Sequence, residues 1–149
     1  MNQAVRNRQA LLDAFAASAV AGAALLVRGL PVASANFPLN DGGLFYVMAR
    51  DVQLAGMQIP ATISYNNALI PFVYPPLAIY FAAVINAILP ISLFDLLRLI
   101  PLLFSFLSVP AVYLAAKEVL ASRFHALIAA AAFAVAPQAY EWVIEGGGD

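Results

Sequence analysis

The sequence predicts an all-α membrane protein with several spanning helices. Hydrophobic residues make up 64% of its 149 residues and charged residues only 10%, and the mean hydropathy is +0.88. A soluble domain is about half apolar and about a quarter charged, because its surface faces water. We therefore expect lipid to be the main solvent of this chain.

Composition also limits the chemistry. The net charge of −1 offers no basic surface to nucleic acid. Without cysteine the chain has no disulfides or thiolate metal sites, and a single histidine excludes a metal site built from several histidines.

The first apolar segment is predicted to cross the membrane over residues 11–32. It follows Arg6 and Arg8, and the positive-inside rule places this basic end in the cytoplasm. The same pattern, with Ala33-Ser34-Ala35 as a cleavage site, would also fit a signal peptide. We favour an uncleaved span because further apolar segments follow. In both cases residues 33–95 form a loop on the outer side.

A surface helix is expected over residues 41–55 of this outer loop. Its start at Asn40-Asp41-Gly42-Gly43 makes Asn40 or Asp41 a candidate N-cap. Four apolar residues share one helical face: Leu44, Met48, Val52 and Ala55. Such an amphipathic helix is suited to lying on the membrane surface.

A second loop helix is expected over residues 76–89, after a stretch with no regular pattern. Pro75 and Pro76 suit a helix start, and Pro90 limits its end. With about 14 residues it falls short of the roughly 17–25 that a span needs. We therefore predict that this proline-cut helix is interfacial or re-entrant.

Two further spans are predicted over residues 96–116 and 124–142, joined by a turn that contains Lys117 and Arg123. If the proline-cut helix crossed the membrane, this turn would lie outside. If it does not cross, the turn shares the cytoplasmic side with Arg6 and Arg8, as the positive-inside rule expects. We adopt the second topology, which places Asp41, Glu145 and Asp149 together on the outer side.

The order of these features resembles the N-terminal part of the GT-C superfamily of membrane glycosyltransferases. That superfamily includes protein O-mannosyltransferases, aminoarabinose transferases and the catalytic subunit of oligosaccharyltransferase. The resemblance covers residues from about Leu11 to Asp149. It is carried by the first span, Asn40-Asp41-Gly42-Gly43-Leu44-Phe45-Tyr46, Tyr74-Pro75-Pro76-Leu77, the helix pair with its charged turn, and a final glycine-acid segment.

This resemblance implies sugar transfer from a polyprenyl-phosphate donor to an unidentified acceptor, at the extracytoplasmic face of a prokaryotic plasma membrane. It also implies that Asp41 is the catalytic carboxylate that activates the acceptor. The alternative is that Asp41 only caps a helix. Many family members carry a second acid here, whereas Gly42 and Gly43 follow Asp41, so metal dependence stays open.

Other candidate residues also come from the resemblance. The second acidic motif maps onto Glu145 and Asp149, which could hold Mg²⁺ or Mn²⁺ through carboxylate oxygens. The glycines between them would let the backbone approach a phosphate. The alternative is that they mark a helix C-terminus that unwinds into a glycine linker. These glycines are Gly146, Gly147 and Gly148.

Two candidates lie elsewhere in the chain. Tyr74, a candidate substrate-binding residue, holds the place of a lysine that precedes the prolines in some relatives, so the phosphate contact of that lysine is missing here. Arg98 could bind the phosphate of a lipid carrier, but snorkelling or pairing with Asp95 is the favoured explanation.

The sequence thus predicts part of a membrane glycosyltransferase whose partners are membrane lipid, the lipid-linked sugar and an acceptor. Three spans are too few to enclose a donor lipid, so we expect the isolated chain to be inactive. The alternative is a non-catalytic membrane subunit or scaffold. Half of a transporter is disfavoured, because its predicted spans hold almost no charge.

Overall fold

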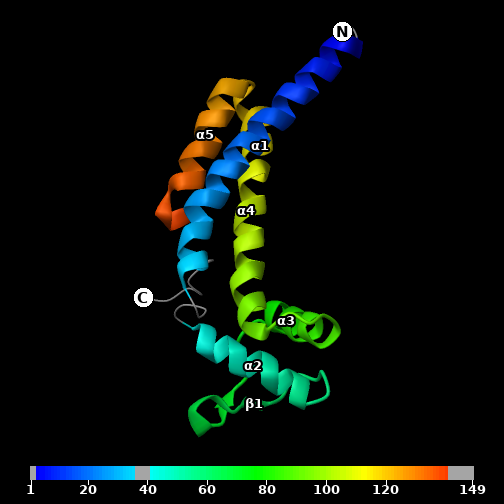
Figure 1. The fold of residues 1–149 in the computed structure, drawn as a ribbon, viewed down its shortest axis with the longest axis vertical. Helices are drawn as coiled ribbons and strands as arrows, with labels where there is room; N and C mark the ends of the chain where they lie inside the picture. Colours follow the sequence, from blue (N-terminus) through cyan, green and yellow to red (C-terminus); the bar gives the residue numbers. More distant parts are fainter. Residues whose placement is uncertain (1–2, 36–40, 141–149) are drawn as a thin grey trace. The chain divides into compact units, whose positions relative to one another are not determined.

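The computed structural model describes residues 3–35 and 41–140, with only the backbone of Arg6, and most of these residues are helical (Figure 1). They form two compact units. Unit 1 contains residues 3–34 and 102–140, and unit 2 contains residue 35 and residues 41–101.

Unit 1 is built from α1 (Gln3–Ser34), the later part of α4 (Leu93–Leu120) and α5 (Arg123–Val135). α1 and α4 are long and apolar enough to cross a membrane, judged by length and composition. At 1.5 Å per residue they measure about 48 Å and about 42 Å, against a hydrocarbon core of about 30 Å. Both helices extend beyond the predicted spans at each end.

An alanine ridge on α5 packs α1 closely against α5. Ala126, Ala130 and Ala134 recur every four residues and are at most 1% exposed. They share a cluster with Val20 and Ala24 of α1. Small side chains allow two helix backbones to approach, which is how helices pack where no hydrophobic effect drives them together.

Arg28 of α1 is fully buried although it carries a charge. Its guanidinium donates to the carbonyl oxygens of Phe133 (Nη2, 2.6 Å), Ala134 (Nε, 3.1 Å) and Ser105 (Nη1, 2.8 Å). It also lies 4.9 Å from the ring centroid of Phe133 and 5.0 Å from that of Tyr140. Carbonyls in the last turn of a helix lack partners within the helix and form the negative end of its dipole. Arg28 therefore caps the end of α5 and ties that end to α1 and α4.

α5 ends earlier than the predicted 124–142 span. It stops at Val135, and the short 3₁₀ turn η2 (Pro137–Ala139) follows. Proline disfavours the helical conformation in the residue before it, and Ala136 is extended (φ −70°, ψ 116°). The 13 residues of α5 measure about 20 Å, less than the bilayer core. Residues 141 and 142 of the predicted span lie outside the described part.

Unit 2 contains α2 (Gly42–Leu54), α3 (Pro76–Ile88) and the first turns of α4. It also holds a two-stranded antiparallel ribbon of β1 (Thr62–Ile63) and β2 (Ile70–Pro71), with η1 (Tyr65–Asn67) between them. The ribbon departs from the all-α expectation and from the irregular loop predicted there.

The ribbon is held to α2 by Asp51. The Asp51 carboxylate accepts hydrogen bonds from the Ser64 backbone N–H (2.6 Å) and hydroxyl (2.9 Å). The chain reverses through Asn66 and Asn67 with φ of 54° and 58°, a left-handed conformation that asparagine tolerates better than most residues. Asp51 thus has a structural role in this turn.

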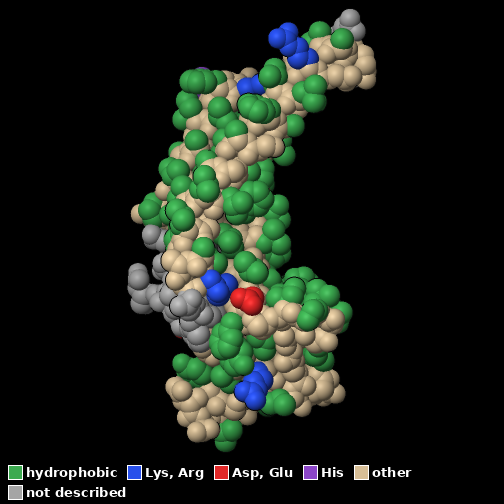
Figure 2. Space-filling view, in the orientation of Figure 1, with side chains coloured by type: hydrophobic (Ala, Val, Ile, Leu, Met, Phe, Trp, Pro, Cys, Tyr) green, Lys and Arg blue, Asp and Glu red, His purple; other side chains and the backbone are tan. Residues whose placement is uncertain are grey.

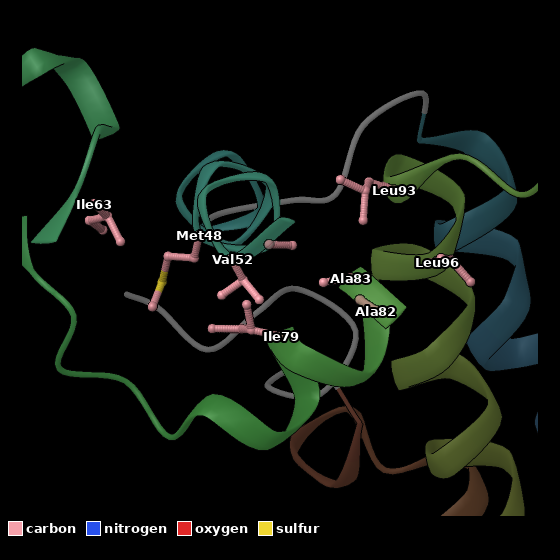
Figure 3. Packing of buried hydrophobic residues seen from close by; sticks show 9 residues of the cluster. Met48, Val52, Ile63, Ile79, Ala82, Ala83, Leu93 and Leu96 are labelled. Atoms are coloured by element: carbon pink, nitrogen blue, oxygen red, sulfur yellow. The ribbon is translucent and has the colours of Figure 1, made fainter. Parts of the chain in front are cut away.

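The apolar face of α2 is buried inside unit 2, contrary to its predicted position on the membrane surface. Met48 and Val52 of α2 are 0% exposed and face Ile79 of α3 (Figure 3). Ala82 and Ala83 of α3 belong to the same cluster, together with Leu93 and Leu96 of α4 (Figure 3). Of the four residues predicted to face the membrane, only Ala55 is exposed. Contact with α3 replaces contact with lipid for this face.

Replacing Arg28 with methionine should destabilise unit 1 by about 2–4 kcal/mol, because the carbonyls at the end of α5 lose their donors while buried. Arg28→Lys should also destabilise it, since one ammonium cannot reach carbonyls on both α4 and α5. Denaturant unfolding in detergent, followed by circular dichroism, measures the change.

The matched control for this experiment is Arg50→Met, which removes an exposed arginine from α2 and should change stability by less than about 0.5 kcal/mol. Equal stability of the Arg28 and Arg50 variants would contradict the role of Arg28 in holding the end of α5.

Candidate functional site

Asp41 and Tyr74, two candidates from the sequence, are in contact in unit 2. The Tyr74 hydroxyl donates a hydrogen bond to Oδ2 of Asp41 at 3.2 Å, although the two residues lie 33 positions apart. Asp41 immediately precedes α2, and Tyr74 precedes the two prolines at the start of α3. The contact therefore joins the starts of the two loop helices.

The Tyr74 ring is positioned by a second contact with the start of α2. Phe45 lies one turn after Asp41, and its ring meets that of Tyr74 edge to face, with centroids 5.2 Å apart and an interplanar angle of 82°. Aromatic pairs favour this geometry. Pro75, with φ −56° and ψ 118°, holds the backbone extended just after Tyr74. The ring is thus fixed by its neighbour on α2 and by the stiff chain that follows it.

The Asp41 carboxylate does not cap α2, which contradicts the structural alternative. Asp41 occupies the N-cap position with φ −70° and ψ 5°, outside the extended conformation that capping uses, and its side chain makes no capping hydrogen bond. Among the described residues, the single hydrogen bond to this carboxylate is the one from Tyr74 at Oδ2. The other oxygen, Oδ1, is left to accept a proton or hydrogen bond from a ligand.

The carboxylate also changes the acidity of Tyr74. A hydrogen bond from the phenol to the Asp41 carboxylate, strengthened by the negative charge, favours the neutral phenol and raises the pKa of Tyr74 above its ordinary value. The stabilisation from this contact is therefore present below the pKa of tyrosine in the unfolded chain. It is lost as the pH rises through the higher pKa of the folded state.

Arg98 forms the ion pair with Asp95 that the sequence favoured. Its Nη1 lies 3.7 Å from Oδ1 of Asp95, three residues earlier in α4. At the start of α4 the Ser92 hydroxyl accepts a hydrogen bond from the Asp95 backbone N–H and donates one to the Asp95 carboxylate. The arginine is thus part of the first turns of α4, and its phosphate-binding role stays a prediction.

The remaining candidates lie outside the described residues: Glu145, Gly146, Gly147, Gly148 and Asp149. Within residues 3–35 and 41–140 no group of three or more acidic or histidine side chains could hold a metal ion. The described neighbour of the Asp41 carboxylate is the Tyr74 hydroxyl, and the metal site at Glu145 and Asp149 stays a prediction.

A polar cluster around Asp13 in unit 1 was missed by the sequence analysis. Oδ1 of Asp13 accepts from Nε of Arg123 (2.8 Å) and from the hydroxyl of Tyr113 (3.1 Å), and Oδ2 accepts from Nζ of Lys117 (3.2 Å). Asp13 is only 14% exposed. An acid at the edge of an apolar run was the available signal, because such residues usually have a specific partner.

Comparisons of the chain with protein-family models, with curated proteins and with solved structures found no match. Figure 2 shows how few charged side chains one face of the molecule presents among hydrophobic and uncharged ones. Because the comparisons found no relative, a function has to be inferred from the geometry, and the contact between Asp41 and Tyr74 is the starting point.

The Asp41–Tyr74 contact can be tested by titration. Subtracting the tyrosinate absorbance of Tyr74→Phe from that of the parent chain gives the titration curve of Tyr74, which should lie at higher pH than that of free tyrosine. In an Asp41→Asn background the same difference curve should move to lower pH, because the negative charge is gone. Asp51→Asn, ten residues later in α2, should leave the curve in place. If the titration curve of Tyr74 is unchanged by Asp41→Asn, the hydrogen bond between Asp41 and Tyr74 does not exist in solution.

Proposed function

We propose that this chain is part of a GT-C-like membrane glycosyltransferase, which transfers a sugar from a polyprenyl-phosphate donor to an acceptor at the extracytoplasmic face. The observation that carries the proposal is the contact of Asp41 with Tyr74. The resemblance makes Asp41 the candidate base, and Tyr74 stands where some relatives have a lysine. The fold brings the two side chains together from segments 33 residues apart.

The chemistry assigned to Asp41 is general-base catalysis. Its carboxylate takes the proton from the nucleophilic group of the acceptor as that group attacks the anomeric carbon of the sugar. The new bond forms between the acceptor and this carbon, while the bond from the carbon to the phosphate oxygen breaks and the polyprenyl phosphate leaves. Tyr74 holds Oδ2, so that Oδ1 points its free lone pair at the acceptor.

A carboxylate is suited to this role only if it is free for the acceptor. Asp41 is partly exposed and does not cap α2. Hydrogen bonding to a neutral phenol orients the carboxylate without adding a positive charge that would weaken it as a base. This environment differs from that of Asp13, whose carboxylate is occupied by two cations and a tyrosine.

The proposal also requires Asp41 to lie on the outer side of the membrane, and the Asp13 cluster supports that arrangement. Asp13 binds Lys117 and Arg123, so the first part of α1 lies beside the turn between α4 and α5. If α1 and α4 each cross the bilayer once, these two regions share a side only when α3 does not cross. Arg6, Arg8, Lys117 and Arg123 then all lie in the cytoplasm, in agreement with the positive-inside rule.

Asp41→Asn should lower transfer activity by about 10²-fold or more, because asparagine cannot accept the acceptor's proton. The measurement is transfer of radiolabelled sugar from a polyprenyl phosphate by membranes that contain the natural gene product. α2 should stay folded, since the Asp41 side chain makes no capping bond.

The control for the activity assay is Asp51→Asn, which makes the same charge change on α2 but faces Ser64. It should keep activity within about threefold. Full activity in Asp41→Asn would exclude the catalytic role and leave the non-catalytic scaffold as the explanation.

A further inference from the structure

α3 has two apolar faces, and unit 2 buries only one of them. Ile79, Ala82 and Ala83 are at most 5% exposed and pack in the cluster with α2. Asn86 completes this inner side: its Oδ1 accepts from Gln53 of α2 at 2.7 Å, and its Nδ2 donates to the carbonyl of Ile91 at 2.7 Å. The other polar side chain of α3, Tyr80, donates a hydrogen bond from its hydroxyl to the Met57 carbonyl at 2.7 Å. Both polar side chains of α3 are thus bonded within unit 2.

The outer face is a stripe of large apolar side chains. Leu77 is 81% exposed, Phe81 49% and Ile88 73%. At about 100° per residue, positions 77, 81 and 88 fall within about 40° of one another around the helix. The buried residues Ile79 and Ala83 lie on the opposite side. Figure 2 shows hydrophobic side chains gathered over the region that Figure 1 labels α3.

No charged residue borders this stripe along the chain. The sequence contains no aspartate, glutamate, lysine or arginine between Asp51 and Asp95. On the surface of a soluble protein, exposed apolar side chains are normally interspersed with charged ones. A large, continuous exposed apolar patch marks a contact with lipid or with another protein. The stripe and the whole segment that carries it are thus uncharged, and insertion into lipid would bury no charge of this segment.

The position of α3 next to α4 identifies the partner. α3 ends at Ile88 and α4 begins at Leu93, so only four residues connect them. Ala82 and Ala83 share a cluster with Leu93 and Leu96 in the first turns of α4. α4 is one of the two helices long and apolar enough to span a membrane, so the first turns of a spanning α4 mark the membrane boundary. α3 is packed at that level.

We propose that α3 lies parallel to the membrane plane, with Leu77, Phe81 and Ile88 inserted into the lipid of the outer leaflet. α3, and not α2, then attaches the loop to the bilayer, because the apolar face of α2 is already buried against α3. The attachment holds the Asp41–Tyr74 contact, at the start of both helices, near the lipid headgroups. This inference rests on the proposed topology and is independent of sugar transfer.

A flat α3 and a crossing α3 differ in the membrane depths of Leu77 and Ile88. Leu77 and Ile88 are 11 residues apart, which is about 16 Å along a helix axis. A helix parallel to the bilayer keeps its stripe at one depth. A helix that crosses or re-enters places these two side chains at depths that differ by much of the 16 Å, about half the thickness of the hydrocarbon core.

The test is spin-label depth measurement on the complete chain in phospholipid vesicles. Because the protein has no cysteine, single replacements Leu77→Cys, Phe81→Cys and Ile88→Cys each carry one nitroxide label. Arg50→Cys, at an exposed position of α2, is the matched control. Oxygen dissolves in lipid and a nickel chelate in water, so the ratio of their collision rates with the label reports its depth.

We expect the three α3 labels to collide at least fivefold more often with oxygen than with the nickel chelate, at equal depths, and the Arg50 label to show the opposite preference. A steady depth gradient from Leu77 to Ile88 would overturn the flat orientation. Nickel access equal to that of Arg50 would exclude lipid contact, and strong coupling between labels on two chains would assign the stripe to a second copy. The depth measurement does not depend on the transfer activity of Asp41→Asn. The lipid contact of α3 and the glycosyltransferase activity can therefore fail independently.

Discussion

The carboxylate of Asp13 is the contact on which the arrangement of this protein depends. It binds Arg123 and Lys117 and also accepts from Tyr113, so it joins α1 to the turn between α4 and α5. An acid that is largely removed from water, as Asp13 is, would be costly without such partners. Because it joins regions 100 or more residues apart, it determines which helix ends lie together. In the proposed topology this contact keeps the first part of α1 and the turn between α4 and α5 on the same side of the membrane.

Arg28 provides the complementary contact about 22 Å further along α1, by helix rise. There the positive charge is satisfied by carbonyl oxygens, two of them from the end of α5. A helix that ends within a bilayer needs such a partner, because lipid offers no hydrogen bonds. Between Asp13 and Arg28 the contact is made by small apolar side chains, with Ala130 at 0% exposure. Polar contacts thus set the register of α1, α4 and α5, and alanine allows the close approach.

Much of the fold follows from local sequence rules, and the rest depends on partners distant in the sequence. The apolar runs predicted a mostly helical chain with helices able to span a membrane, and Pro75-Pro76 marks where α3 begins. Pro137 was present in the sequence, but its effect on the end of α5 was overlooked. The burial of Met48 and Val52 could not be read from α2 alone, because an amphipathic face fits lipid and protein equally. The hydrogen bond between Asp41 and Tyr74 could not be predicted either, because the two residues lie 33 positions apart.

The central claim is that α1 and α4 each cross the bilayer once while α3 does not. The most direct test is thiol labelling of single-cysteine variants in sealed vesicles, with a reagent that cannot cross membranes. The cysteines replace Asn7, Gln58 and Ala121, one at a time. The account predicts that Asn7→Cys and Ala121→Cys react from the same side and Gln58→Cys from the opposite side. If Ala121→Cys reacts from the same side as Gln58→Cys, α3 and α4 together cross an even number of times, and the proposed topology is wrong.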